Sequence, residues 1–131
     1  MQVISQRIVA SSCRLHSCGL KIKLKDIIYE SINISGSGLL EFSFGQDGGT
    51  GCLDWIMWQY SPTACDDIFN NTLAPILCNW NGQCEGFTGV ANTLPPGGAG
   101  SNFEPALNVN AGEQYLVCLS NYSSQTTTLP L

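Results

Sequence analysis

The sequence predicts an all-β protein, an antiparallel β-sandwich with one short helical turn and no longer helix. Apolar and polar residues alternate with a period of two in several short stretches, as they do in half-buried strands. No stretch of ten residues shows the 3.6-residue period of an amphipathic helix, and segments rich in glycine and proline separate the alternating stretches. About seven or eight short strands of this kind are typical of a sandwich.

The first two expected strands flank a Gly-Ser-Gly segment at residues 36–38. Ile27–Ser35 alternates, and so does Leu40–Phe44. A hairpin around the glycine pair would join these two strands. Residues 45–51 form a loop by composition, because four of the seven are glycine.

Leu53–Tyr60 is the expected central strand, and Pro62 ends it. Its alternation puts Trp55 and Trp58 on opposite faces. The two indoles therefore do not form one sugar-stacking surface, and at least one of them belongs to the core, where its N–H needs a partner.

The second half of the chain reads as a helical turn followed by short strands. Ala64–Asn71 is the expected turn, with Asp66 and Asp67 at its start, where the helix dipole favours negative charge. The expected strands are Ile76–Trp80, Ala106–Asn110, Gln114–Tyr122 and a last one that begins at Thr126. A long connection rich in glycine and proline runs from Gln83 to Asn102, and loops of this length are usually functional or disordered.

The charges are few and unevenly placed. Charged residues make up 11% of the chain, against about 25% in an ordinary globular protein. All five Lys and Arg lie in the first 25 residues, and all ten Asp and Glu follow them, so residues 26–131 carry a net charge of −10. The negative charge of residues 26–131 excludes nucleic acid and anionic lipid as their partners, since binding to either requires clustered basic residues.

Seven cysteines in 131 residues predict disulfides and an exported, extracellular or cell-surface protein. No C-x2-C pair occurs and there is one histidine, so the spacing does not favour a metal site. Cys65 and Cys78 flank a compact excursion after a strand, and we expect a bridge between them. Cys52, Cys84 and Cys118 offer one further pair, which the sequence does not assign.

Residues 1–25 differ from the rest and are expected to be an atypical basic arm or linker, with a β-sandwich module in 26–131. The first 25 residues lack the apolar core of a signal peptide. A linker from a larger protein, a fragment boundary or an edge strand of the domain would each account for them, and we favour the first two. No stretch approaches 18 apolar residues, so we expect no transmembrane segment.

Five segments carry a resemblance to a known family: SGSGLLEFSF, CLDWIMWQYSPTACDDIF, APILCNWNGQCEGFTGV, LPPGGAGSNFEPALNV and AGEQYLVCLSNYSS. In order and spacing they resemble ectodomain modules of Bacteroidota surface proteins that carry gliding-motility-associated or type IX secretion C-terminal sorting domains. The resemblance implies a jelly-roll or CUB-like sandwich, neighbouring domains in a longer chain and no enzymatic activity. It also implies that the module is truncated at its C-terminus. The family's aspartate-rich strand is kept only as Leu53-Asp54-Trp55.

The leading functional hypothesis is a non-catalytic, extracellular adhesive module that binds a glycan or another ligand. A purely structural spacer is one alternative, and a carboxylate-based hydrolase of the glycoside class is another. A hydrolase needs two facing carboxylates, and Asp54, Glu85 and Glu104 are the candidates. A nucleophile paired with the single histidine is disfavoured, because His16 lies in the basic arm.

Calcium is the cofactor that the carboxylates allow. Loops and strand ends of a sandwich could bring together oxygen ligands from Asp47, Asp54, Asp66, Asp67 and Glu104. The alternative is structural: Asp66 and Asp67 cap the helical turn, Asp47 belongs to a turn, and Asp54 is hydrogen-bonded at a strand edge. The sequence has no D-x-D-x-D-G loop that would favour the metal.

The expected ligand-binding surface lies on the connection from Asn81 to Asn102, since a sandwich presents its loops at the ends of its sheets. Trp80, Glu85, Phe87 and Asn102 would form a polar and aromatic surface there, with Asp47 and Asp54 adjacent. The alternative is that the connection only covers an open sheet edge.

Overall fold

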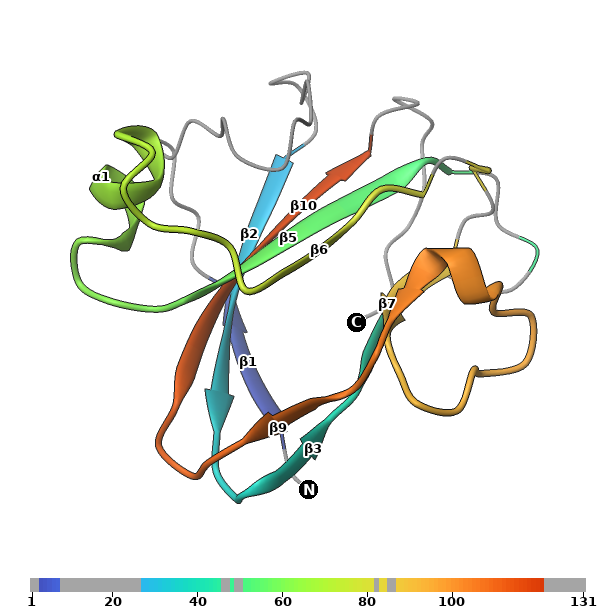
Figure 1. Cartoon of the computed structure of the whole chain (residues 1–131), viewed down its shortest axis with the longest axis horizontal. Coiled ribbons are helices and arrows are strands. Elements are labelled where there is room, and N and C mark those ends of the chain that lie inside the picture. Colours follow the sequence, from blue (N-terminus) through green and yellow to red (C-terminus); the bar gives the residue numbers. More distant parts are fainter. Residues whose placement is uncertain are drawn as a thin grey trace.

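The structure is a computed structural model that describes residues 3–7, 27–45, 48, 51–81, 83–84 and 87–121. Strands dominate it, and they form a sandwich-like arrangement in which one large sheet faces two small ones (Figure 1). The helices of the described part are α1 (Ala64–Phe69) and the 3-10 turn η1 (Gly100–Asn102). The predicted all-β class with only short helical segments is confirmed.

The large sheet has five antiparallel strands in the order β1-β2-β10-β5-β6. They are β1 (Val3–Arg7), β2 (Ile27–Ile34), β10 (Gln114–Asn121), β5 (Leu53–Gln59) and β6 (Leu77–Asn79). The central position belongs to β10, and β5 lies beside it. The edge strand β1 comes from the segment expected to be an arm, and the division of the chain at residue 25 stays a prediction.

The second layer consists of two small sheets. In one, β3 (Gly38–Leu40) pairs with β9 (Leu107–Val109); in the other, β4 (Phe42–Gly45) pairs with β7 (Phe87–Val90), which runs parallel to β8 (Phe103–Glu104). The predicted hairpin at residues 36–38 is wrong, because β2 and β3 belong to different sheets. The glycine pair carries the chain from one layer to the other.

The strand β5 is buried on both faces, as its position between two layers of side chains requires. Leu53, Trp55 and Met57 pack into the core between the sheets. Ile56 and Trp58 pack on the opposite face. Both predicted tryptophan orientations are confirmed, and with exposures of 1% and 0% neither indole is free to stack on a ligand.

The outer face of the large sheet is covered by α1, whose Ala64 and Ile68 are buried there. The predicted helical turn is confirmed. Asp67 accepts hydrogen bonds from the Oγ1 atoms of Thr63 and Thr72 at 2.8 and 3.3 Å, so this carboxylate fastens the helix to its flanking turns. Among the described residues, no helix is long and apolar enough to cross a membrane.

A disulfide joins Cys52, just before β5, to Cys84, 32 residues further on. Cys118 has a free thiol in the middle of β10, and burial raises its pKa to about 12, so the thiol stays neutral and unreactive. Cys65 and Cys78 are both disulfide-bonded. The bridge expected between them stays a prediction, which peptide mapping under non-reducing conditions tests.

Candidate functional site

The candidate site begins at Trp80, directly after the edge strand β6. Its side chain is 68% exposed. Asn79 before it and Asn81 after it are buried, with exposures of 8% and 0%. Successive residues of an extended chain point to opposite sides, so the two asparagines turn inward and the indole turns outward. Trp80 is the most exposed of the large hydrophobic side chains in the described part of the chain.

Asn79 holds this segment to the second layer. Its Nδ2 donates to Oε1 of Glu104 at 2.8 Å and to the carbonyl oxygen of Ser101 at 3.2 Å. The Ser101 hydroxyl in turn lies 3.2 Å from Oε1 of Gln83, to which it donates. These bonds place the exposed polar side chains of Gln83 and Ser101 close to the residue that precedes Trp80.

Asp54 anchors the other side of the same segment. It is 3% exposed, and its Oδ1 accepts a hydrogen bond from the backbone N–H of Asn81 at 3.2 Å. Burial raises the pKa of Asp54 to about 6, against a smaller lowering by that hydrogen bond. A buried carboxyl with a raised pKa costs stability when it ionises, and such groups are enriched at functional sites.

The register of the sheet relates Asp54 to Trp80. Trp55 and Asn79 are directly opposite each other across β5 and β6, so their side chains share the inner face of the large sheet. Alternation then puts Asp54 and Trp80 together on the outer face. The exposed indole and the buried carboxyl therefore belong to the same corner of the molecule.

A buried chain of hydrogen bonds runs through the inner side of this corner. The Nε1 of Trp55 donates to Oγ1 of Thr88 at 3.0 Å, and that hydroxyl donates to the carbonyl oxygen of Asn102 at 2.6 Å. Asn102 was expected on the exposed surface, but it is fully buried. Its backbone carbonyl is the last acceptor in this chain of bonds, so Asn102 belongs to the buried residues that support the site.

Phe87 also belongs mainly to the residues that support the site. It is partly buried and packs edge-to-face against Phe103, with the ring centroids 5.5 Å apart. The expected irregular connection contains the strand β7 and the turn η1, and the disulfide at Cys84 ties its start to Cys52, just before β5. Glu85 lies outside the described residues.

The expected calcium ligands are dispersed where the structure describes them. Asp66 and Asp67 lie on α1, at the opposite side of the molecule from the β7 region (Figure 1), while Asp54 and Glu104 lie on β5 and β8. Among the described residues, no three Asp, Glu, His or Cys side chains are grouped so as to hold a metal ion. Asp47 lies outside these residues, and calcium stays a prediction.

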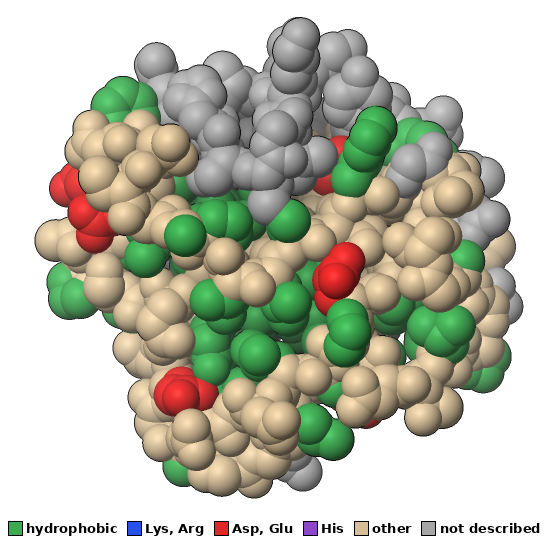
Figure 2. All heavy atoms as spheres, viewed as in Figure 1, with side chains coloured by type: hydrophobic (Ala, Val, Ile, Leu, Met, Phe, Trp, Pro, Cys, Tyr) green, Lys and Arg blue, Asp and Glu red, His purple; other side chains and the backbone are tan. Residues whose placement is uncertain are grey.

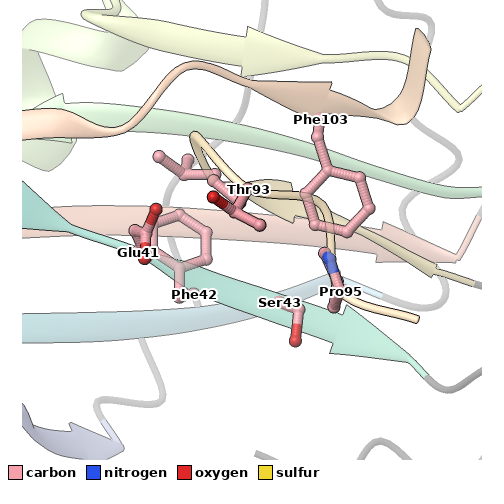
Figure 3. A pocket seen from close by; sticks show the side chains of 8 residues that line it. Glu41, Phe42, Ser43, Thr93, Pro95 and Phe103 are labelled. Carbon is pink, nitrogen blue, oxygen red and sulfur yellow. The ribbon is translucent and has the colours of Figure 1, made fainter. Parts of the chain in front are cut away.

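A second feature, which the sequence did not predict, is an open groove of about 210 Å³ between β4 and the loop that follows β7 (Figure 3). Its lining is Glu41, Phe42, Ser43, Val90, Ala91, Thr93, Pro95 and Phe103. One carboxylate lines it, so it lacks the two facing carboxylates of a glycoside hydrolase. The alternation of residues 40–44 indicated a strand here, but no local signal indicated that the distant loop would lie over it.

The surface charge fits the sequence. Figure 2 shows Asp and Glu side chains scattered over one face, with no Lys or Arg among the side chains coloured on it. The sequence has no Lys or Arg after Lys25. A ligand of Trp80 therefore meets an indole on a part of the chain, residues 26–131, that carries carboxylates and no Lys or Arg.

No protein-family model matches this chain, no curated protein is significantly similar to it, and no solved structure matches its fold. The resemblance to ectodomain modules of Bacteroidota surface proteins therefore stays a prediction.

Proposed function

We propose that this chain is a non-catalytic, extracellular binding module that contacts a glycan through Trp80. The observation that carries the proposal is the contrast along three consecutive residues, where Trp80 is 68% exposed between asparagines exposed by 8% and 0%. The backbone on both sides of Trp80 is thus fixed by buried residues, and its indole projects into solvent. A large aromatic surface held in place binds with little loss of side-chain entropy.

The chemistry around Trp80 suits an uncharged sugar. Gln83 and Ser101 supply amide and hydroxyl groups beside Asn79, the residue before Trp80, and such groups hydrogen-bond readily to sugar hydroxyls. An anionic glycan would meet a body of net charge −10 without a compensating cation in residues 26–131. We therefore propose a neutral glycan as the ligand.

The cellular setting is proposed on the same basis. A disulfide between Cys52 and Cys84 is typical of proteins that leave the cytosol. The resemblance to modules of Bacteroidota surface proteins adds an adhesive role, linked to gliding motility or type IX secretion, within a longer chain. Calcium would then act as a ligand that holds loops together, with Asp47 as one candidate.

One observation favours a hydrolase as the second candidate. Burial raises the pKa of Asp54 to about 6, the range in which a carboxyl acts as a general acid near neutral pH. Yet Asp54 is 3% exposed, and its Oδ1 is engaged with the backbone of Asn81. A substrate would need direct access to that carboxyl, so we favour the binding module.

Glycan-array screening of the full chain, with and without a calcium chelator, tests the proposal. We expect binding to neutral glycans. Loss of the signal on chelation would support calcium-dependent adhesion, and an unchanged signal would support stacking without metal. The absence of any bound glycan would contradict the proposal and favour the spacer, and turnover of an arrayed glycan would favour the hydrolase.

A further inference from the structure

The groove beneath the loop after β7 is a separate site from the Trp80 corner. Glu41 lies between β3 and β4, where the chain passes from one small sheet to the other. In Figure 3, Phe42 and Glu41 lie at one end of the groove, and the Phe103 ring and Pro95 lie at the other. Aromatic and aliphatic walls thus flank a single carboxylate.

Hydrogen bonds fix the position of the loop that forms one side of the groove. Oε1 of Glu41 accepts from the backbone N–H of Asn92 at 2.8 Å, and Oδ1 of Asn92 accepts from the N–H of Ala106 at 3.0 Å. The N–H of Ala91 donates to the carbonyl oxygen of Glu104 at 2.9 Å. The loop is therefore fastened to β8 and to the residues after it, as well as to Glu41.

Gly98 shows how closely the far wall is packed. A Cβ atom at this position would lie 3.0 Å from the carbonyl oxygen of Pro95 and 3.1 Å from the Phe103 ring. The loop also turns on itself here, since the N–H of Gly98 donates to that carbonyl at 2.9 Å. The wall formed by Pro95 and Phe103 is therefore closely packed, and a hydrogen bond fixes the turn of its loop.

The carboxylate of Glu41 has capacity for a ligand. Glu41 is exposed, and the hydrogen bond it accepts from Asn92 uses Oε1. Oε2 accepts no hydrogen bond from another described residue. A carboxylate beside aromatic faces suits a cation with a flat or aliphatic body.

We propose that this groove binds an arginine side chain of a partner protein. The guanidinium would pair with Oε2 of Glu41 and stack against the partly exposed ring of Phe42. A lysine ammonium is compact and stacks on a ring less well. A volume of about 210 Å³ is below the usual range of about 300–1,000 Å³ for small-molecule sites. It suits one side chain, and residues 26–131 contain no Lys or Arg to fill it.

The partner is expected to be basic around this arginine. Residues 26–131 carry ten carboxylates and no Lys or Arg, so their field attracts a positively charged surface and accelerates its association. Leu94 is 42% exposed between Thr93 and Pro95 of the groove. It offers an apolar contact at the rim, next to the proposed arginine.

Titration of the ¹⁵N-labelled full chain with N-acetyl-arginine-methylamide, followed by NMR, tests this proposal. We expect the largest shifts at the amides of Ser43 and Thr93. The neutral citrulline analogue, which keeps the planar shape, should bind at least about threefold more weakly, as the loss of an exposed ion pair predicts. The lysine analogue should fall between the two.

Two variants separate a local contact from general attraction. Glu41→Gln keeps an oxygen for the N–H of Asn92 and should weaken arginine binding about threefold. Glu113→Gln removes the same charge from an exposed turn elsewhere and should leave the affinity nearly unchanged. Equal weakening by both variants, equal affinity for citrulline or lysine, or shifts confined to residues outside the groove would overturn the proposal.

Discussion

Two sets of side chains on and beside β5 are almost equally buried but opposite in kind. The apolar half of this contrast is Trp55, Ile56, Met57 and Trp58, which are at most 1% exposed among apolar neighbours. The polar half is Asp54, which is 3% exposed, and Asn81, to whose backbone N–H it is bonded. The apolar half stabilises the sandwich by removing hydrocarbon from water, whereas the polar half contains a carboxyl whose ionisation costs stability.

At Asp54 and Asn81 the molecule departs from what folding alone requires. Apolar side chains of similar size at the polar end would avoid the cost of burying these groups. The polar groups instead fix the backbone on either side of Trp80. We infer that the apolar half holds the fold together and that the polar half presents the indole.

The largest expected effect is in the apolar half. Trp55→Ala should lower the free energy of unfolding by about 4 kcal/mol, because it leaves a large cavity and removes the partner of Thr88. Urea denaturation measures this. A loss below about 1 kcal/mol would contradict the role of Trp55 as a core residue.

The disulfide joins the residue before β5 to the segment that follows Trp80. Replacing Cys52 and Cys84 together by alanine should lower the free energy of unfolding by about 3–4 kcal/mol, since their bridge closes a long loop in the unfolded chain. Denaturation of the wild type in the presence and absence of reductant provides a control. Unchanged stability of the double variant would show that the segment around Trp80 is held by its hydrogen bonds alone.

In the polar half, Asp54→Asn is expected to stabilise the protein. In the wild type the pKa of Asp54 is raised from 3.8 to about 6, so the folded state holds this proton more tightly than the unfolded state. The stability due to this group is therefore complete below pH 4 and is lost as the pH rises to about 6.

The asparagine keeps an oxygen for the N–H of Asn81 and carries no charge. We expect the variant to be about 2 kcal/mol more stable than the wild type above pH 6 and to differ little from it near pH 4. Urea denaturation at several pH values measures the difference. A variant that is less stable at pH 7 would show that the ionised carboxylate stabilises this corner.

The smallest expected effect separates the two buried indoles. The N–H of Trp55 donates to Thr88, whereas Nε1 of Trp58 is buried without a hydrogen-bond partner among the described residues. Trp55→Phe should therefore cost about 1 kcal/mol more than Trp58→Phe, by the value of one buried hydrogen bond. Equal costs in urea denaturation would remove this distinction.

The sequence was informative wherever one strand determines its own pattern. Alternation alone gave the two faces of β5, because a strand exposes successive side chains to opposite sides. The short α1 was indicated by its acidic start.

The pairing of distant segments could not be read in the same way. The strand β3 pairs with β9, nearly 70 residues away, and the local glycine pair indicated a hairpin instead. The strand β7 was hidden in a segment rich in glycine, because Gly89 occupies a point where a Cβ atom would overlap the backbone of Phe42. Both the groove and the partner of Asn79 depend on such long-range contacts.

Calorimetry of the wild type and two variants with the glycan that binds best on the array tests whether Trp80 is the contact surface. Trp80→Ala removes the exposed indole, and Phe69→Ala removes an aromatic ring that is 48% exposed on α1. We predict that the first variant loses at least about tenfold in affinity with little change in stability, and that the second binds as the wild type does. Unchanged binding by Trp80→Ala, or an equal loss in both variants, would contradict the proposal that Trp80 is the contact surface.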